Sequence, residues 1–375
     1  MPCQRPIPEL FIMQKSAVRI LVFAFTIATL MSPGAFSQEV SLWKKEAATK
    51  EINGLRRYGW ALADGIGKTL ENAPSDTFPA VNVFMRDFRT AFADVDPDVT
   101  PEKWKLIDVE TQVIHNPNYW AAVYEIAPAD PLLMWFHASL YAVNGQVHRA
   151  FYAQQLALHS PVDTPFRKEM GRLLISAGRV ISIGEMGIQN GIKLHDLQKY
   201  DQAVAVYRDV LSVVPSHSLA LYELGYCLDT VAREKEGRGQ NVSAPFFADA
   251  RRFDPFMIES YQGNFSADEY QRLITLKTRA KPTWDKFSQT SPDQDNMNEL
   301  KLLSSHFQDA ALHDLALIVR QLVVAHRDGS YSDDDRRFIE TSLKSLVPKG
   351  DTAATVSKLG RGRKELRIKN ITGVE

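Results

Sequence analysis

The chain has 375 residues, of which 45% are hydrophobic and 24% are charged. Its 44 Lys and Arg residues are balanced by 45 Asp and Glu residues, so the formal net charge is −1 at pH 7. This composition excludes disordered and collagen-like chains and is typical of a folded globular protein. It also argues against a protein that binds the phosphate backbone of nucleic acids, because such proteins carry a large positive excess.

Residues 1–37 have the features of a secretory signal peptide. Lys15 and Arg19 precede an apolar run, 20–31, and small residues then lead to a cleavage position before Gln38. The run is shorter than the roughly 20 residues that a helix needs to span a bilayer. We therefore expect an exported chain, periplasmic or secreted; the alternative is an uncleaved anchor or a buried helix.

Cleavage of this segment leaves Cys227 as the single cysteine of the mature chain, because Cys3 is removed. One thiol cannot close an internal disulfide, so the fold depends on its apolar core. Cys227 lies in an apolar stretch without a flanking His or basic residue. We expect it to be packed and unreactive.

Apolar residues recur at intervals of three and four in 41–72 and in 80–94, which predicts amphipathic helices. Further apolar runs follow, and prolines mark their borders at Pro117, Pro128, Pro131, Pro161 and Pro165. The sequence therefore predicts an all-α fold in which short antiparallel helices stack against one another.

The segment 184–255 contains a repeated spacing of small, aromatic and proline residues. Offsets of four, seven and twelve relate the members of two sets: Ala203, Tyr207, Val210 and Pro215, then Ser243, Phe247, Ala250 and Pro255. The spacing resembles the second helix of a tetratricopeptide repeat (TPR), a family with a period of 34 residues. The second repeat is longer, and we assign its extra residues to a lengthened turn over 233–240. The alternative is an unrelated pair of helical hairpins.

The resemblance implies a TPR-like α-solenoid over 38–287 that binds a protein or peptide partner on a concave surface made by the first helices. Applied to this sequence, the register of the family places the following residues on the inner face: Ile192 and His195 in the first repeat, and Leu219, Tyr222, Tyr226 and Asp229 in the second. The alternative role for Tyr222 and Tyr226 is ordinary packing between helices.

Three glycines, Gly184, Gly187 and Gly191, lie three and four residues apart on one face of the first predicted repeat helix. We interpret them as a face for close helix approach rather than as a phosphate-binding loop.

The C-terminal part divides into a polar linker, 288–298, a helical segment, 299–348, and a basic tail, 349–375, which we expect to be poorly ordered. Ser332 and Asp335 have the spacing of a helix capping box.

An Asp-Gly turn, Asp328 and Gly329, precedes this capped helix. On that pattern, 300–347 resembles a tellurite-resistance-B-type helical domain.

No motif predicts catalysis, a cofactor or a metal site. Residues 67–69 resemble the end of a phosphate-binding P-loop, but Leu62 stands where that loop needs glycine. The Gly329 turn resembles half of an EF-hand, yet Val324 and His326 occupy the earlier ligand positions. The sequence also lacks His-Glu-x-x-His and Gly-x-Ser-x-Gly. We therefore predict a binding or scaffold protein rather than an enzyme.

Two alternatives stay open. The first is an exported helical enzyme, a hydrolase or lyase acting on glycans, whose site assembles from distant helices. The second is a scaffold of the cell envelope whose basic tail makes weak contact with an anionic surface.

Overall fold

The computed structural model describes ten stretches of the chain, all within one compact unit, 42–375. They are residues 43–72, 78–95, 107–127, 131–162, 164, 166–236, 242–261, 266–291, 297–327 and 329–359. The predicted signal peptide and the last part of the predicted basic tail, 360–375, lie outside them. Within these stretches, no helix combines the length and the mean hydropathy needed to cross a membrane.

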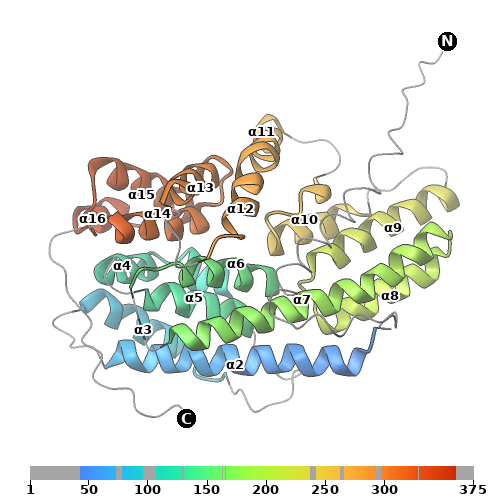
Figure 1. The fold of residues 1–375 in the computed structure, drawn as a ribbon, viewed down its shortest axis with the longest axis horizontal. Coiled ribbons are helices and arrows are strands. Elements are labelled where there is room, and N and C mark those ends of the chain that lie inside the picture. The colour runs from blue at the N-terminus through green and yellow to red at the C-terminus, as the bar shows by residue number, and fades with distance from the viewer. Residues whose placement is uncertain are drawn as a thin grey trace. The chain divides into compact units, whose positions relative to one another are not determined.

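All regular secondary structure in the described stretches is helical, which confirms the predicted all-α class (Figure 1). Its fifteen α-helices are α2 (Lys45–Glu71), α3 (Pro79–Ala91), α4 (Pro117–Ile126), α5 (Leu132–Val143), α6 (Val147–Leu158), α7 (Arg167–Asp196), α8 (Tyr200–Val213), α9 (Ser218–Glu236), α10 (Ala244–Phe253), α11 (Ala267–Thr275), α12 (Lys281–Phe287), α13 (Met297–Asp309), α14 (His313–Arg327), α15 (Asp333–Leu346) and α16 (Thr352–Ser357). Shorter helical pieces are the π-helices η2 (Glu110–Ile114) and η4 (Leu276–Ala280) and the 3₁₀ turn η3 (Ile258–Ser260).

The centre of the main core is α5, whose twelve residues are all buried. Its sequence is apolar on every side, so neighbouring helices must cover it on every side. Four helices provide a closed arrangement: α2 packs against α5 and α7, and α6 packs against the same two helices. The apolar face of the amphipathic helix α2 packs into this core; it includes Ile52, Leu55 and Ile66.

The C-terminal helices share this main core. Leu300 and Phe307 of α13 and Leu322 of α14 belong to the same apolar cluster as Leu55 of α2. α14 packs on α6, and α16 packs on α4. The sequence predicts a linker over 288–298 between two pieces, but one continuous core contains apolar side chains from both sides of it.

The capping box predicted for α15 is confirmed. Ser332 Oγ accepts from the backbone N–H of Asp335, and the Asp335 carboxylate accepts from the N–H of Ser332 at 2.7 Å. The same carboxylate pairs with Arg327 at 2.6 Å and with Arg320 at 3.1 Å. Asp335 is therefore occupied by local partners, as a structural cap rather than as a metal ligand.

The first part of the predicted tail differs from the expectation. Residues 349–359 include α16, and Val356 and Leu359 are buried. Arg336 of α15 donates to the carbonyl oxygens of both residues, at 3.1 and 2.7 Å. The basic composition of 349–375 suggests a solvated end. Burial of Val356 and Leu359 and the hydrogen bonds from Arg336 nevertheless hold 349–359 against α15.

The segment 184–255 forms two consecutive helical hairpins, α7–α8 and α9–α10. α9 packs against both α7 and α8, and α10 packs against α9. Ala203, Tyr207 and Val210 are completely buried in a second core between these helices. The first part of the predicted turn, 233–236, is helical instead, because α9 continues to Glu236, and 237–240 lie outside the described residues.

Helix α7 joins the two cores. It is 30 residues long; Met170 and Ile181 lie in the main core, whereas Ile188 lies in the second. Its glycine face confirms the interpretation of close helix approach. A Cβ added at Gly191 would lie 2.3 Å from a ring carbon of Tyr207. This distance is too short for any real contact, so the glycine permits the observed packing of α7 on α8.

We expect Gly191→Ala to destabilise the protein by about 1–3 kcal/mol, because the added methyl group must displace the buried Tyr207 ring. Gly171→Ala is the matched control on the same helix. No atom lies within 4 Å of its added Cβ, so it should stabilise the helix by roughly 0.5–1 kcal/mol. Urea unfolding of both variants measures the difference. Equal effects at the two positions would contradict this packing.

Candidate functional site

Aromatic side chains from four helices form a continuous series beside the α7–α9 contact. Tyr200, His195, Tyr226, Tyr222 and Phe247 follow one another with ring centroids 5.2, 5.4, 6.2 and 5.6 Å apart. We call these five residues the aromatic row. Phe247 is buried, whereas the other four are partly exposed. Three residues of the predicted binding face, His195, Tyr222 and Tyr226, therefore come together in one exposed feature.

Local sequence explains how the row assembles. Tyr222 and Tyr226 are four residues apart, so they lie one turn apart on the same side of α9. His195 lies in the last turn of α7, and Tyr200 is the first residue of α8. The connection between them is tight: Gln198 has a φ of +60°, and this left-handed residue turns the chain back so that Tyr200 meets His195.

The other predicted binding residues have mainly internal contacts. Leu219 is partly buried and packs against the second core and against a small cluster around Leu221. The Asp229 carboxylate accepts from the N–H of Ser243 at 3.2 Å and from its hydroxyl at 2.8 Å. Asp229 therefore fixes the start of α10 on α9. Ile192 is likewise partly buried against the second core.

The sequence did not single out Glu223, which follows Tyr222 on α9. Its half-buried carboxyl has a pKa raised to about 7, first by burial and then by the negative charges of Asp196 and Glu259. These neighbours are exposed and belong to α7 and η3. No positive charge contributes to this shift, which burial and the two carboxylates account for. The only sequence signal was its place beside Tyr222 on the predicted inner face.

Two polar atoms near this carboxyl group lack hydrogen-bond partners among the described residues. One is the hydroxyl of Tyr207, which is fully buried; the other is Nε2 of His195. Burial raises the pKa of Tyr207, and the charges of Glu223 and Asp196 raise it further, which places the phenol within their electrostatic reach. The Nδ1 atom of His195 lies 3.9 Å from Asp196.

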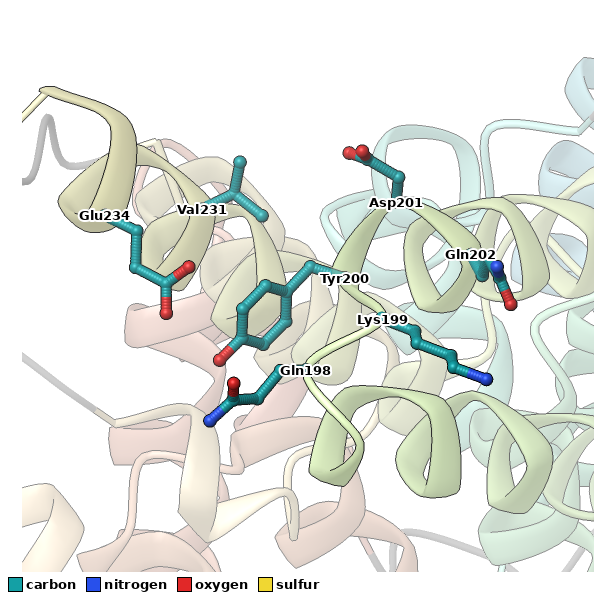
Figure 2. A pocket seen from close by; sticks show the side chains of 7 residues that line it. All are labelled: Gln198, Lys199, Tyr200, Asp201, Gln202, Val231 and Glu234. Carbon is teal, nitrogen blue, oxygen red and sulfur yellow. The ribbon is translucent and has the colours of Figure 1, made fainter.

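A small pocket opens at the Tyr200 end of the row. Its volume is about 210 Å³, and its lining residues are Gln198, Lys199, Tyr200, Asp201, Gln202, Val231 and Glu234. In Figure 2 the hydroxyl end of Tyr200 points toward Gln198 and Glu234, while Lys199 and Gln202 extend to the other side. Burial and then a hydrogen bond to Glu234 raise the pKa of Tyr200. The pocket is polar and carries charges of both signs.

Beneath the row, a buried polar cluster ties α9 and α10 to α6. Ser218 Oγ lies 3.3 Å from His148 Nε2 and 3.4 Å from the Asp254 carboxylate. Asp254 also accepts from the Tyr152 hydroxyl at 2.9 Å and from the backbone N–H of Phe256 at 2.8 Å. Burial lowers the pKa of His148, so its imidazole is neutral at pH 7.

This cluster contains serine, histidine and aspartate, but its geometry differs from a nucleophilic triad. In a triad the histidine stands between the other two groups. Here the Asp254 oxygen that contacts Ser218 lies 3.8 Å from His148 Nδ1, so all three side chains meet in one compact group. Each is less than a tenth exposed. The arrangement satisfies buried polar atoms and fixes the second hairpin.

Cys227 is completely buried behind the row, and its Sγ lies 3.7 Å from the carbonyl oxygen of Tyr200. Burial raises the pKa of its thiol to about 11, with smaller contributions from Glu223 and Asp201. The thiol is protonated at neutral pH, which confirms the predicted packed and unreactive cysteine. Among the described residues, no group of three or more His, Cys, Asp or Glu side chains is placed to hold a metal ion.

No protein-family model, no curated protein and no solved structure matches the chain.

We expect Asp254→Ala to destabilise the protein by about 3 kcal/mol, because it removes the acceptor of several buried hydrogen bonds. Asp249→Ala, an exposed site on α10, should change stability by less than about 0.5 kcal/mol. Urea unfolding compares the two. Covalent labelling of Ser218 in the folded protein by a fluorophosphonate would argue against a purely structural cluster.

Glu223→Gln should stabilise the protein at pH 8 by about 1–3 kcal/mol and have little effect at pH 4.5. The folded-state pKa of about 7 exceeds the ordinary value of 4.5. Glu223 therefore contributes stability below pH 4.5, and this contribution is lost as the pH rises through 7. The midpoint of thermal unfolding, followed against pH for variant and wild type, checks the sign.

The exposed Asp249 in the middle of α10 provides a control for this pH series. Asp249→Asn should change the midpoint little at either pH value. A Glu223→Gln gain that is independent of pH would contradict the electrostatic origin of the effect.

Proposed function

We propose that this chain is an exported, TPR-like protein that binds a segment of a partner protein along the aromatic row. The observation that carries this proposal is the row itself, in which four of five rings keep exposed surface although they contact one another. Large rings that are partly exposed in a fixed array are typical of protein-binding surfaces.

Mutual contact prepares these rings for binding. Tyr222 and Tyr226 are nearly parallel, with an interplanar angle of 19°, and Tyr222 also stacks on the buried Phe247 at 29°. Neighbouring rings restrict the rotamers that each side chain can adopt. A partner therefore meets a surface that loses little side-chain entropy on binding, which leaves more of the contact free energy for affinity.

The packing of α7–α10 supports the TPR-like part of the proposal. In an α-solenoid each helix pair packs on the next, and the first helices line one wall. Here α9 contacts both helices of the preceding hairpin. His195 of the first hairpin and Tyr226 of the second lie in ring contact across the α7–α9 boundary. The row thus runs across the boundary between the two proposed repeats.

The proposed export rests on the sequence of 1–37, with its two basic residues, its apolar run and its small residues before Gln38. On this basis the partner would be a protein of the periplasm, the cell surface or the exterior.

The double variant Tyr222→Ala/Tyr226→Ala should bind the partner at least about tenfold more weakly. Truncation of an aromatic anchor at an interface costs about 1.4 kcal/mol of binding free energy or more. A photo-crosslinking amino acid placed at Tyr200, the edge of the row, provides the readout in the native envelope. We expect a discrete covalent adduct with the parent chain and a strongly reduced one with the double variant.

The control places the same crosslinker at Tyr270, an exposed tyrosine of α11 outside the row. Its adducts should be the same with and without the double substitution. The thermal midpoint of the double variant must also be measured, since Tyr222 packs on Phe247. An undiminished Tyr200 adduct in a folded double variant would overturn the proposed function.

A further inference from the structure

Carboxylates accompany the rings of the aromatic row: Glu223 follows Tyr222 on α9, and Asp196 follows His195, whose ring contacts Tyr226 of α9. Glu223 of α9, Asp196 of α7 and Glu259 of η3 interact through their charges, and each belongs to a different element. Glu223 is half-buried, whereas Asp196 and Glu259 are exposed. Since repulsion among like charges disfavours this arrangement, a positively charged group placed against Glu223 would stabilise it.

Two buried polar atoms, one in the second core and one in the row, lack partners among the described residues. The Tyr207 hydroxyl is fully buried and makes no hydrogen bond to any described residue, and the same holds for His195 Nε2. An unsatisfied buried polar group costs free energy, and native proteins keep few of them. Glu223 keeps exposed surface, unlike the Tyr207 hydroxyl, so it is the group here that a ligand with hydrogen-bond donors can reach.

The length of the aromatic row limits the shape of an occupant. The rings extend from Tyr200, beside the pocket of Figure 2, to Phe247 on α10, so an occupant must be extended. Their exposed faces suit apolar side chains and also cations, which are attracted to the faces of tyrosine rings. Lysine and arginine combine an apolar stem with a charged end, and both parts find a matching surface here.

We propose that the occupant of the aromatic row is a lysine- or arginine-containing segment of the partner protein, held with one positive charge against Glu223 and Asp196. The inference rests on the proposed function, because it assigns the chemistry of the partner at the same surface. Binding is then partly electrostatic, so it weakens as salt rises, while the aromatic contacts are less sensitive to salt.

The experiment uses the purified protein and a displayed library of random peptides of about 12 residues, roughly 40 Å when extended. Selection at low salt should enrich peptides that place Lys or Arg next to apolar residues. The best peptide is synthesised with each Lys or Arg in turn replaced by norleucine, which keeps the apolar stem. Fluorescence anisotropy should show at least about tenfold weaker binding for one such replacement.

The protein variant Glu223→Gln/Asp196→Asn tests the other side of the contact. This variant should bind the peptide at least about tenfold more weakly than the wild type. Its affinity should also fall less than that of the wild type when salt is raised from about 0.05 to 0.5 M. At pH 8, where Glu223 is ionised, Asp333→Asn/Glu340→Gln removes the same number of charges from α15 and should leave binding unchanged. This control separates local recognition from the effect of net charge.

The outcomes distinguish this inference from the proposed function. Peptides that need Tyr222 and Tyr226 but carry no enriched cation, or bind equally well to Glu223→Gln/Asp196→Asn, would keep the row as a binding surface and overturn the cationic partner. Peptides that bind equally to the Tyr222→Ala/Tyr226→Ala variant would overturn the proposed function itself. A library without any peptide whose binding depends on Glu223 would also overturn this inference.

Discussion

The arrangement of the candidate site depends on one helix that belongs to two cores. α7 begins among the apolar side chains of the main core and ends beside the aromatic row, 30 residues later. Its glycine face lets α8 approach so closely that Tyr207 contacts the backbone of Gly191. Because α7 is one continuous helix with its first half packed in the main core, that packing fixes the positions of His195 and Asp196 at its other end.

A second connection holds the other side of the row. Asp254, at the end of α10, accepts hydrogen bonds from Tyr152 of α6, and Ser218 at the start of α9 contacts both Asp254 and His148. The second hairpin is therefore attached to the main core directly as well as through α7. Two attachments by different routes restrict rotation of α9 against α7, which is the movement that would separate Tyr226 from His195.

The sequence predicted features that depend on nearby residues. The spacing of Ala203, Tyr207 and Val210 indicated a buried helix face, and Ser332 indicated a cap; both are local and both are present. It did not show that 299–348 shares the main core, or that Asp229 is occupied by a residue fourteen positions away. Those outcomes depend on contacts between distant segments. Glu223 was missed for the same reason, since its neighbours Asp196 and Glu259 come from other elements.

The same residues stabilise the fold and keep exposed surface. Tyr222 stacks on buried Phe247, whereas Tyr226 contacts His195 across the boundary between the two hairpins. Rings used only for packing would be expected to lie fully in the interior, and Tyr207 shows that this chain buries a tyrosine completely where packing requires it. Four of the five rings of the row stay partly exposed beside Glu223, whose negative charge is disfavoured by the like charges of Asp196 and Glu259. An extended cationic segment would cover the first and neutralise the second in a single binding step.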